Sequence, residues 1–130
     1  MSEEYTIHVR PKGSARAVDF LRDAEAAIGA TFSPDAGGDG LVASTATKVV
    51  YAYVEGVDLE DDGDVPLSRY RWYLEQIPMK TEAARRATLE HMRSIYDALV
   101  ATGRYGCCLV HSLSTLLANN DGLTSRVMSG

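Results

Sequence analysis

Residues 69–111 read RYRWYLEQIPMKTEAARRATLEHMRSIYDALVATGRYGCCLVH, and this stretch decides the fold. Its middle carries a helix signal, because Thr81 can cap the first free amides and Gly103 can take the left-handed conformation that ends a helix. Apolar residues between them recur at helical spacing, namely Leu89, Met92, Ile95, Tyr96, Leu99 and Val100. This spacing predicts a long helix with one side buried against the rest of the protein.

Strand-like segments flank this helix on both sides. Residues 69–77 alternate between two sets of side chains, which predicts a half-buried strand. One face would carry Tyr70, Trp72 and Leu74, and the other would carry Arg69, Arg71, Tyr73 and Glu75. Beyond the helix, residues 105–113 predict a last strand.

The first half of the chain repeats this kind of pattern. Residues 5–10 alternate like a half-buried strand, and residues 47–55, which are rich in valine and tyrosine, predict another strand. Between them, Ser14 is the predicted N-cap of a first helix that ends at Gly29. Residues 33–40 are typical of a loop, and the residues after them are compatible with an extra strand.

The order strand, helix, strand, strand, helix, strand predicts an α+β domain of the ferredoxin-like βαββαβ type. Both helices would cover one face of an antiparallel sheet, because each is apolar on one side only. We expect a single domain over residues 1–118 with a short C-terminal extension. Residues 114–120 predict one short turn of helix, and residues 119–130 are predicted to be a flexible tail.

The composition is that of a soluble globular protein and disfavours several classes. The chain has 130 residues, of which 45% are hydrophobic, and a net charge of −5. This charge disfavours binding to nucleic acid or to an anionic membrane, and no apolar run approaches the ~18–20 residues of a membrane span. The acidic N-terminus lacks the apolar part of a secretory signal, and the two cysteines are adjacent, which argues against a disulfide framework. These features predict a cytoplasmic protein.

The most biased segment is an acidic loop at residues 55–64. Its six carboxylates are Glu55, Asp58, Glu60, Asp61, Asp62 and Asp64. The spacing of Asp58, Glu60 and Asp62 resembles the start of an EF-hand calcium loop, but Arg69 stands where that loop needs its last glutamate. We therefore expect no metal here. The remaining interpretations are a solvated hairpin loop and a docking surface for a cationic partner, which clustered carboxylates attract.

A second candidate surface is the outer face of the predicted sheet. Arg69, Arg71 and Tyr73 would lie there, beside Tyr51 and Tyr53. Aromatic and arginine side chains on a sheet stack on bases in RNA-recognition modules. The signature motifs of those modules are absent and the net charge is negative. Cross-strand pairs, or an interface with a protein or with a second copy of the chain, therefore fit these residues better.

The cysteines and histidines do not form a recognisable catalytic or metal site. Cys107 and His111 are about 13 Å apart along a strand, at ~3.3 Å per residue, which is too far for a shared metal or a nucleophile–base pair. Cys108 points to the opposite face, and zinc-ligand spacing is absent. The glycines of residues 37–40 lack the lysine of a phosphate-binding loop, and Ser112 is not in a nucleophile elbow. We predict buried cysteines, no cofactor, and a binding module rather than an enzyme.

The leading hypothesis is a small acidic protein-binding module, an inhibitor or immunity-type protein, that docks a basic protein partner. Its partner-binding residues would be Asp58, Glu60, Asp61, Asp62 and Asp64 of the acidic loop, with Arg69, Arg71, Tyr73, Tyr51 and Tyr53 of the adjoining surface. In size, acidity and lack of catalytic motifs the chain is similar to bacterial toxin-neutralising immunity proteins, a resemblance that involves no specific motif. The alternative is a homodimeric ferredoxin-like protein or enzyme with a small-molecule pocket between helices and sheet. A third hypothesis is a nucleic-acid binder that uses the sheet face.

Overall fold

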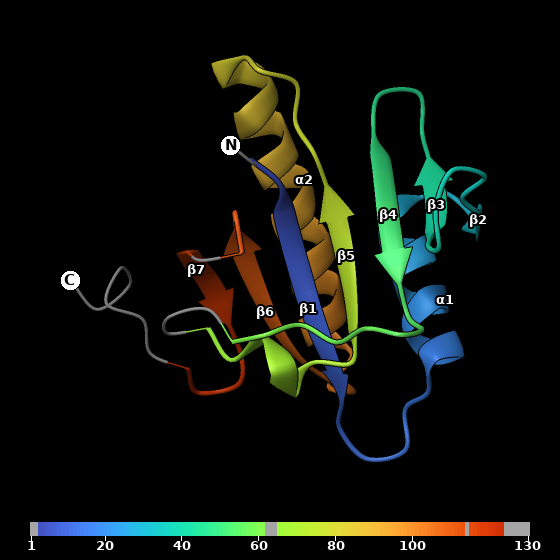
Figure 1. The fold of residues 1–130 in the computed structure, drawn as a ribbon, viewed down its shortest axis with the longest axis vertical. Helices are drawn as coiled ribbons and strands as arrows, with labels where there is room; N and C mark the ends of the chain where they lie inside the picture. The colour runs from blue at the N-terminus through green and yellow to red at the C-terminus, as the bar shows by residue number, and fades with distance from the viewer. Residues whose placement is uncertain (1–2, 62–64, 114, 124–130) are drawn as a thin grey trace.

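The computed structural model of the chain describes residues 3–61, 65–113 and 115–123. These residues form a mixed α+β fold with a seven-stranded antiparallel sheet and two α-helices (Figure 1). The helices are α1 (Ala17–Ile28) and α2 (Glu82–Ala101), and a short 3-10 turn, η1, spans Leu67–Arg69. The strands are β1 (Tyr5–Pro11), β2 (Ser33–Pro34), β3 (Leu41–Ser44), β4 (Val49–Tyr53), β5 (Trp72–Gln76), β6 (Tyr105–His111) and β7 (Thr115–Asn119).

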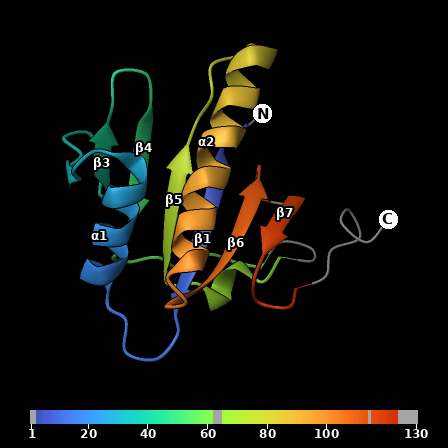
Figure 2. The same ribbon diagram turned by 180° about the vertical axis from the view of Figure 1, so that it is seen from behind.

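The strands lie in the order β2-β3-β4-β5-β1-β6-β7, so β1 is an inner strand. It pairs with β5 on one side and with β6 on the other, and every neighbouring pair is antiparallel. Both helices cover the same face of this sheet (Figure 2). The predicted antiparallel α+β fold is confirmed. The sheet is larger than the four strands of a simple ferredoxin-like domain, so that specific fold is not confirmed.

Helix α2 begins and ends where its capping residues predict. Thr81 is the N-cap, and its hydroxyl accepts a hydrogen bond from the backbone N–H of Ala84 at 3.0 Å. Gly103 follows the helix with a φ of 72°, in the left-handed region. Met92 and Leu99 are fully buried, which confirms the apolar side of the helix.

Helix α1 starts later than predicted. Its N-cap is Arg16, so the expectation that Ser14 caps this helix is wrong. The reason is that Asp19 caps from inside the first turn, where its carboxylate accepts a hydrogen bond from the backbone N–H of Arg16 at 2.9 Å. Gly29 ends the helix with a φ of 83°, as predicted.

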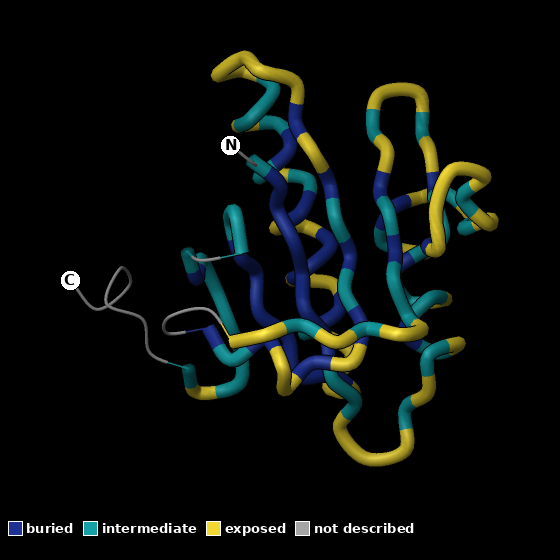
Figure 3. The backbone as a smooth tube through the Cα atoms, in the orientation of Figure 1, coloured by how far each residue is buried: buried dark blue, intermediate teal, exposed yellow. Residues whose placement is uncertain are grey.

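The main core lies between the helices and the sheet. Phe20 of α1 stacks on Trp72 of β5 with ring centroids 5.3 Å apart, and Tyr105 of β6 meets both rings edge-on. Figure 3 shows β1 and β6 buried along most of their length, whereas the β3–β4 and β5–α2 connections are exposed.

The opposite face of the sheet is crossed by residues 54–61 and 65–71 (Figure 1). A second apolar cluster forms beneath them from Val65, Leu67, Tyr70, Cys108, Val110 and Leu116. The prediction that Tyr70 shares a face with Trp72 is wrong, because η1 interrupts the extended segment and β5 starts only at Trp72. We call the side of the sheet away from the helices the open face.

Residues 115–119 form a strand in place of the predicted turn of helix. β7 pairs with β6, and Leu116 lies opposite Val110. Asn120 continues this pairing through its side chain, which accepts a hydrogen bond from the backbone N–H of Cys107 at 2.7 Å and donates one to the carbonyl of Tyr105 at 3.0 Å. The start of the predicted tail is thus bound to β6, and residues 124–130 lie outside the described residues.

Candidate functional site

A row of aromatic rings crosses the open face from β4 to β1. Tyr53 and Tyr73 lie opposite each other on neighbouring strands, and their rings stack with centroids 4.6 Å apart. Tyr73 also stacks on His8, its partner on β1, at 5.4 Å. Side chains alternate along a strand, so these rings face away from the helices while Trp72 and Leu74 fill the main core.

Beside the Tyr53–Tyr73 pair the surface is hollowed by about 280 Å³. The two tyrosines form part of its wall, and Asp39, Glu55 and Asp58 bring carboxylates to the same hollow. These carboxylates come from the loop before β3 and from the segment that follows β4 and crosses the sheet. We call this site, defined by the two tyrosines and the three acidic residues, the acidic hollow.

Two glycines allow the chain to form the acidic hollow. A Cβ atom at Gly40 would lie only 2.8 Å from a ring carbon of Tyr53 and 2.9 Å from the carbonyl oxygen of Ala52. The absence of a side chain therefore lets the loop that carries Asp39 pack directly against the tyrosine. Gly56 has a φ of 65°, and this left-handed conformation turns the chain after β4 so that Asp58 reaches the same site.

At neutral pH the acidic hollow combines negative charge with neutral aromatic rings. Burial raises the pKa of Tyr73 to about 12, and the nearby charge of Glu75 adds to this effect. Burial also raises the pKa of Tyr53, again with help from neighbouring carboxylates. Among the residues that the structure describes, no cation forms an ion pair with the three carboxylates of the hollow. The site therefore presents carboxylate acceptors that a cation could use, together with the tyrosine ring surface that is left uncovered by the stacking of Tyr73 between Tyr53 and His8.

Three of the predicted partner-binding residues meet in the acidic hollow, namely Asp58, Tyr53 and Tyr73. Tyr51 lies on the same face of β4, where it is half-buried. Asp39 is the member that sequence reasoning missed. Its glycine-rich loop gives no signal for this position, because only the close approach of Gly40 to Tyr53 brings the loop to the sheet.

The other predicted residues lie outside the hollow. Glu60 and Asp61 are exposed, and Asp61 accepts hydrogen bonds from the hydroxyl and the backbone N–H of Ser68 at 2.6 and 3.0 Å, which lower the pKa of Asp61. Arg69 and Arg71 are exposed, but Arg69 belongs to η1 and Arg71 precedes β5. Their expected place within a strand is therefore wrong. Asp62 and Asp64 fall outside the described residues.

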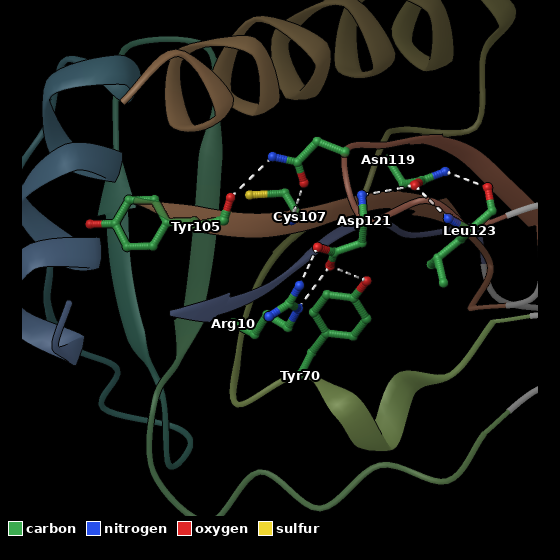
Figure 4. Close-up of polar contacts among 8 residues, drawn as sticks. Arg10, Tyr70, Tyr105, Cys107, Asn119, Asp121 and Leu123 are labelled. Atoms are coloured by element: carbon green, nitrogen blue, oxygen red, sulfur yellow. Dashed lines mark hydrogen bonds and ion pairs between the residues drawn. The ribbon is translucent and has the colours of Figure 1, made fainter. Parts of the chain in front are cut away.

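A second polar cluster lies at the other end of the open face, around Asp121 (Figure 4). The side chain of Asp121 is only 1% exposed, and it accepts hydrogen bonds from Arg10 and, at 2.8 Å, from the hydroxyl of Tyr70. Burial alone would raise the pKa of Asp121, but the hydrogen bonds and charge of Arg10 and the bond from Tyr70 outweigh it and hold that pKa below its usual value. The polar groups of this cluster pair with one another, so the cluster acts as a structural anchor.

Three further titratable groups, His8, Cys107 and Cys108, are fully buried in the sheet. Burial lowers the pKa of His8 to about 4, so this ring is neutral at pH 7; its Nε2 pairs with the hydroxyl of Thr6 at 2.8 Å. Burial raises the pKa of Cys107 and of Cys108 to about 12, so both remain protonated thiols. The prediction that both cysteines are buried is confirmed.

Comparison with known proteins gives no relative: no protein-family model matches the chain, and neither the curated proteins nor the solved structures yield a match. Within residues 3–61, 65–113 and 115–123, neither helix combines the length and apolar character that crossing a membrane requires. In these same ranges, no three histidine, cysteine, aspartate or glutamate side chains lie close enough together to hold a metal ion, and this includes the three carboxylates of the acidic hollow.

Proposed function

We propose that this protein is a non-catalytic binding module that docks a basic protein partner and takes one lysine or arginine side chain of that partner into the acidic hollow. The observation that carries the proposal is the stacked Tyr53–Tyr73 pair next to three carboxylates in one hollow of about 280 Å³. This arrangement supports the hypothesis of a basic partner. In this proposal the partner contacts Asp58 and its neighbours in the hollow rather than the whole acidic loop.

The chemistry of the hollow suits a cation in two ways. A guanidinium or ammonium group placed within ~6 Å of a tyrosine ring is attracted by the negative face of that ring. The carboxylates of Asp39, Glu55 and Asp58 can add charge-assisted hydrogen bonds, for which arginine offers a planar pair of donors. The net charge of −5 would also speed the approach of a basic partner before the specific contact forms.

The proposal also includes a ferredoxin-like core for the fold. The inner strands β4, β5, β1 and β6, together with α1 and α2, follow the order of the split βαβ pattern. In this interpretation β2, β3 and β7 are additions at the two edges of the sheet. An inhibitor or immunity role in the cytoplasm is also part of the proposal, and two free buried cysteines suit a reducing compartment.

The binding site can be tested with small peptides on the ¹⁵N-labelled full chain. We expect acetyl-Gly-Arg-Gly-amide to shift the NMR signals of Tyr53, Gly56 and Tyr73, whereas the peptide with neutral citrulline in place of arginine should shift them little. The triple variant Asp39→Asn, Glu55→Gln, Asp58→Asn should weaken binding about tenfold, which corresponds to ~1.4 kcal/mol.

A control triple variant separates the hollow from net charge. Glu82→Gln, Glu90→Gln and Asp97→Asn remove the same charge from exposed positions of α2. Arginine-peptide binding should persist in this control. Equal weakening in both triples would show general charge attraction, and equal shifts with arginine and citrulline would show that the peptide binds without the help of its charge. Either result would rule out the acidic hollow as a cation site.

A further inference from the structure

A second hollow lies where the sheet forks between β4 and β5. The two strands pair from Tyr53 opposite Tyr73 to Tyr51 opposite Glu75, and the pairing stops there. Beyond it, the β3–β4 connection and the β5–α2 connection stand apart (Figures 1 and 3). A groove of about 380 Å³ is lined by Lys48, Val49, Gln76, Ile77, Met79 and Thr88, among others. We call it the fork groove.

The rim of the fork groove holds an unusual share of exposed apolar surface. The large hydrophobic side chains exposed in the described part of the chain are Val18, Val49, Ile77 and Met79, and all but Val18 line this groove. Ile77 is 62% exposed and Met79 is 78% exposed. Single exposed apolar residues are ordinary, but several around one hollow mark an interaction site. Methionine in particular adapts its shape to different partners.

The charge of the fork groove is opposite to that of the whole chain. Lys48 is the charged side chain in its lining, and in the described residues it forms no ion pair. Behind the lining, His91 bonds to the amide oxygen of Gln76 at 2.9 Å. Burial and the charge of Lys48 lower the pKa of His91, so the base of the groove is polar but neutral at pH 7. An occupant with an apolar body and a carboxylate would match this arrangement.

We propose that the fork groove binds an extended apolar peptide segment of a protein partner, with a carboxylate of that segment at Lys48. The fork supplies the argument for a peptide, because Val49 and Val50 of β4 and Gln76 of β5 lie past the last pair of these two strands and leave the facing edges open. An added strand can bond to such open strand edges, while pockets for its side chains provide selectivity. No residue that lines the fork groove also lines the acidic hollow, so this proposal does not depend on the proposed function.

The probe is acetyl-Thr-Val-Thr-Ile-Leu, made once with a free C-terminal carboxylate and once as the amide, and titrated into the ¹⁵N-labelled full chain. We expect the free acid to shift the signals of Val49, Ile77 and Met79. Lys48→Gln should weaken the free acid about fivefold, as one lost ion pair predicts, and should leave the amide unchanged.

Variants of exposed residues test the apolar contact without risk to the core. Ile77→Ser combined with Met79→Ser should weaken both peptides, whereas Val18→Ser, a matched apolar residue of α1, should weaken neither. The triple variant of the acidic hollow should bind both peptides normally, which keeps this test separate from that of the proposed function. Equal loss in the Val18 control would overturn the proposal. Decanoate serves as a further probe. If decanoate shifts these signals and neither peptide does, the occupant is a small amphiphile and the proposal is overturned.

Discussion

Arg10 and Asp121, 111 residues apart in the chain, form a two-point ion pair: Nη2 lies 2.6 Å from Oδ1 and Nε lies 3.0 Å from Oδ2. The hydroxyl of Tyr70 adds a third hydrogen bond to the same carboxylate. The three residues belong to β1, to the turn before β5 and to the turn after β7. This contact joins the start and the end of the described chain to the segment that crosses the open face.

The first prediction concerns this anchor. Arg10→Met should lower the free energy of unfolding by about 3–5 kcal/mol, because it leaves the buried Asp121 carboxylate without its charged partner. Asp121→Asn should cost less, because the Arg10 side chain that loses its partner is 35% exposed. Since the folded-state pKa of Asp121 is lowered, its contribution is complete above the unfolded pKa of about 3.9 and is lost as the pH falls through the folded pKa. Urea unfolding should thus show a smaller difference between wild type and Asp121→Asn in strong acid. A difference that does not change with pH would contradict this account.

A second prediction tests the space around that anchor. A Cβ atom at Gly106 would lie 2.6 Å from Oδ2 of Asp121 and 2.8 Å from Nε of Arg10, so Gly106→Ala should cost about 1–3 kcal/mol. Gly37 provides the control, because a Cβ atom there meets nothing within 4 Å. Gly37→Ala should change stability by less than about 1 kcal/mol. Equal melting temperatures of the two variants would mean that Asp121 is not where the structure places it.

The third prediction concerns His8 and acid. Its pKa is lowered to about 4 in the folded protein, so the unfolded chain binds more protons between that value and about 6.5. The stability that the neutral ring contributes is complete above about pH 6.5, and an amount on the order of 3 kcal/mol is lost as the pH falls toward 4. His8→Phe should make this loss shallower in unfolding curves measured from pH 7 to pH 4. His91, whose pKa is also lowered, acts in the same direction and remains in the variant. An unchanged slope in the variant would exclude His8 as the source.

The fourth prediction concerns the two thiols. Cys107 and Cys108 are fully buried and their pKa values are about 12, so a disulfide reagent at pH 8 should modify them only when the protein opens. The labelling rate should rise with urea in parallel with unfolding. Ala98→Cys, at an exposed position of α2, is the positive control and should react at once. If the native cysteines react as fast as this control, the interior is more open than the structure shows.

Much of the fold could be predicted because its signals are local. The N-cap Thr81, the left-handed Gly103 and the apolar spacing between them fix α2 without knowledge of the rest of the chain. The strands β1 and β5 likewise follow from alternation. The end of the described chain could not be predicted in this way. Asn120 and Asp121 are typical of a loop, yet both form hydrogen bonds with distant parts of the sheet. Sequence patterns report propensity, and they do not report which distant group will satisfy a polar side chain.

The candidate site was predicted only in part for the same reason. Tyr53, Tyr73 and Asp58 follow from composition and alternation, since aromatic residues on the outer side of strands stand out beside an acidic loop. Asp39 enters the acidic hollow through the packing of Gly40 on Tyr53, a contact between residues on different elements that no periodicity indicates. The fork groove depends on where two strands stop pairing, which is a property of the assembled sheet.

The inner position of β1 has a consequence for how the protein is made. The ribosome produces β1 before its two neighbours, β5 and β6, which are completed only at residues 76 and 111. During translation the apolar side chains of Ile7 and Val9 therefore have no sheet to join, and both edges of the strand stay open to wrong partners. In such a nascent chain the central strands of the sheet can pair only after residue 76 has been made, so the sheet cannot form strand by strand in the order of synthesis. A chaperone that binds exposed strands could therefore bind β1 until β5 and β6 have been made.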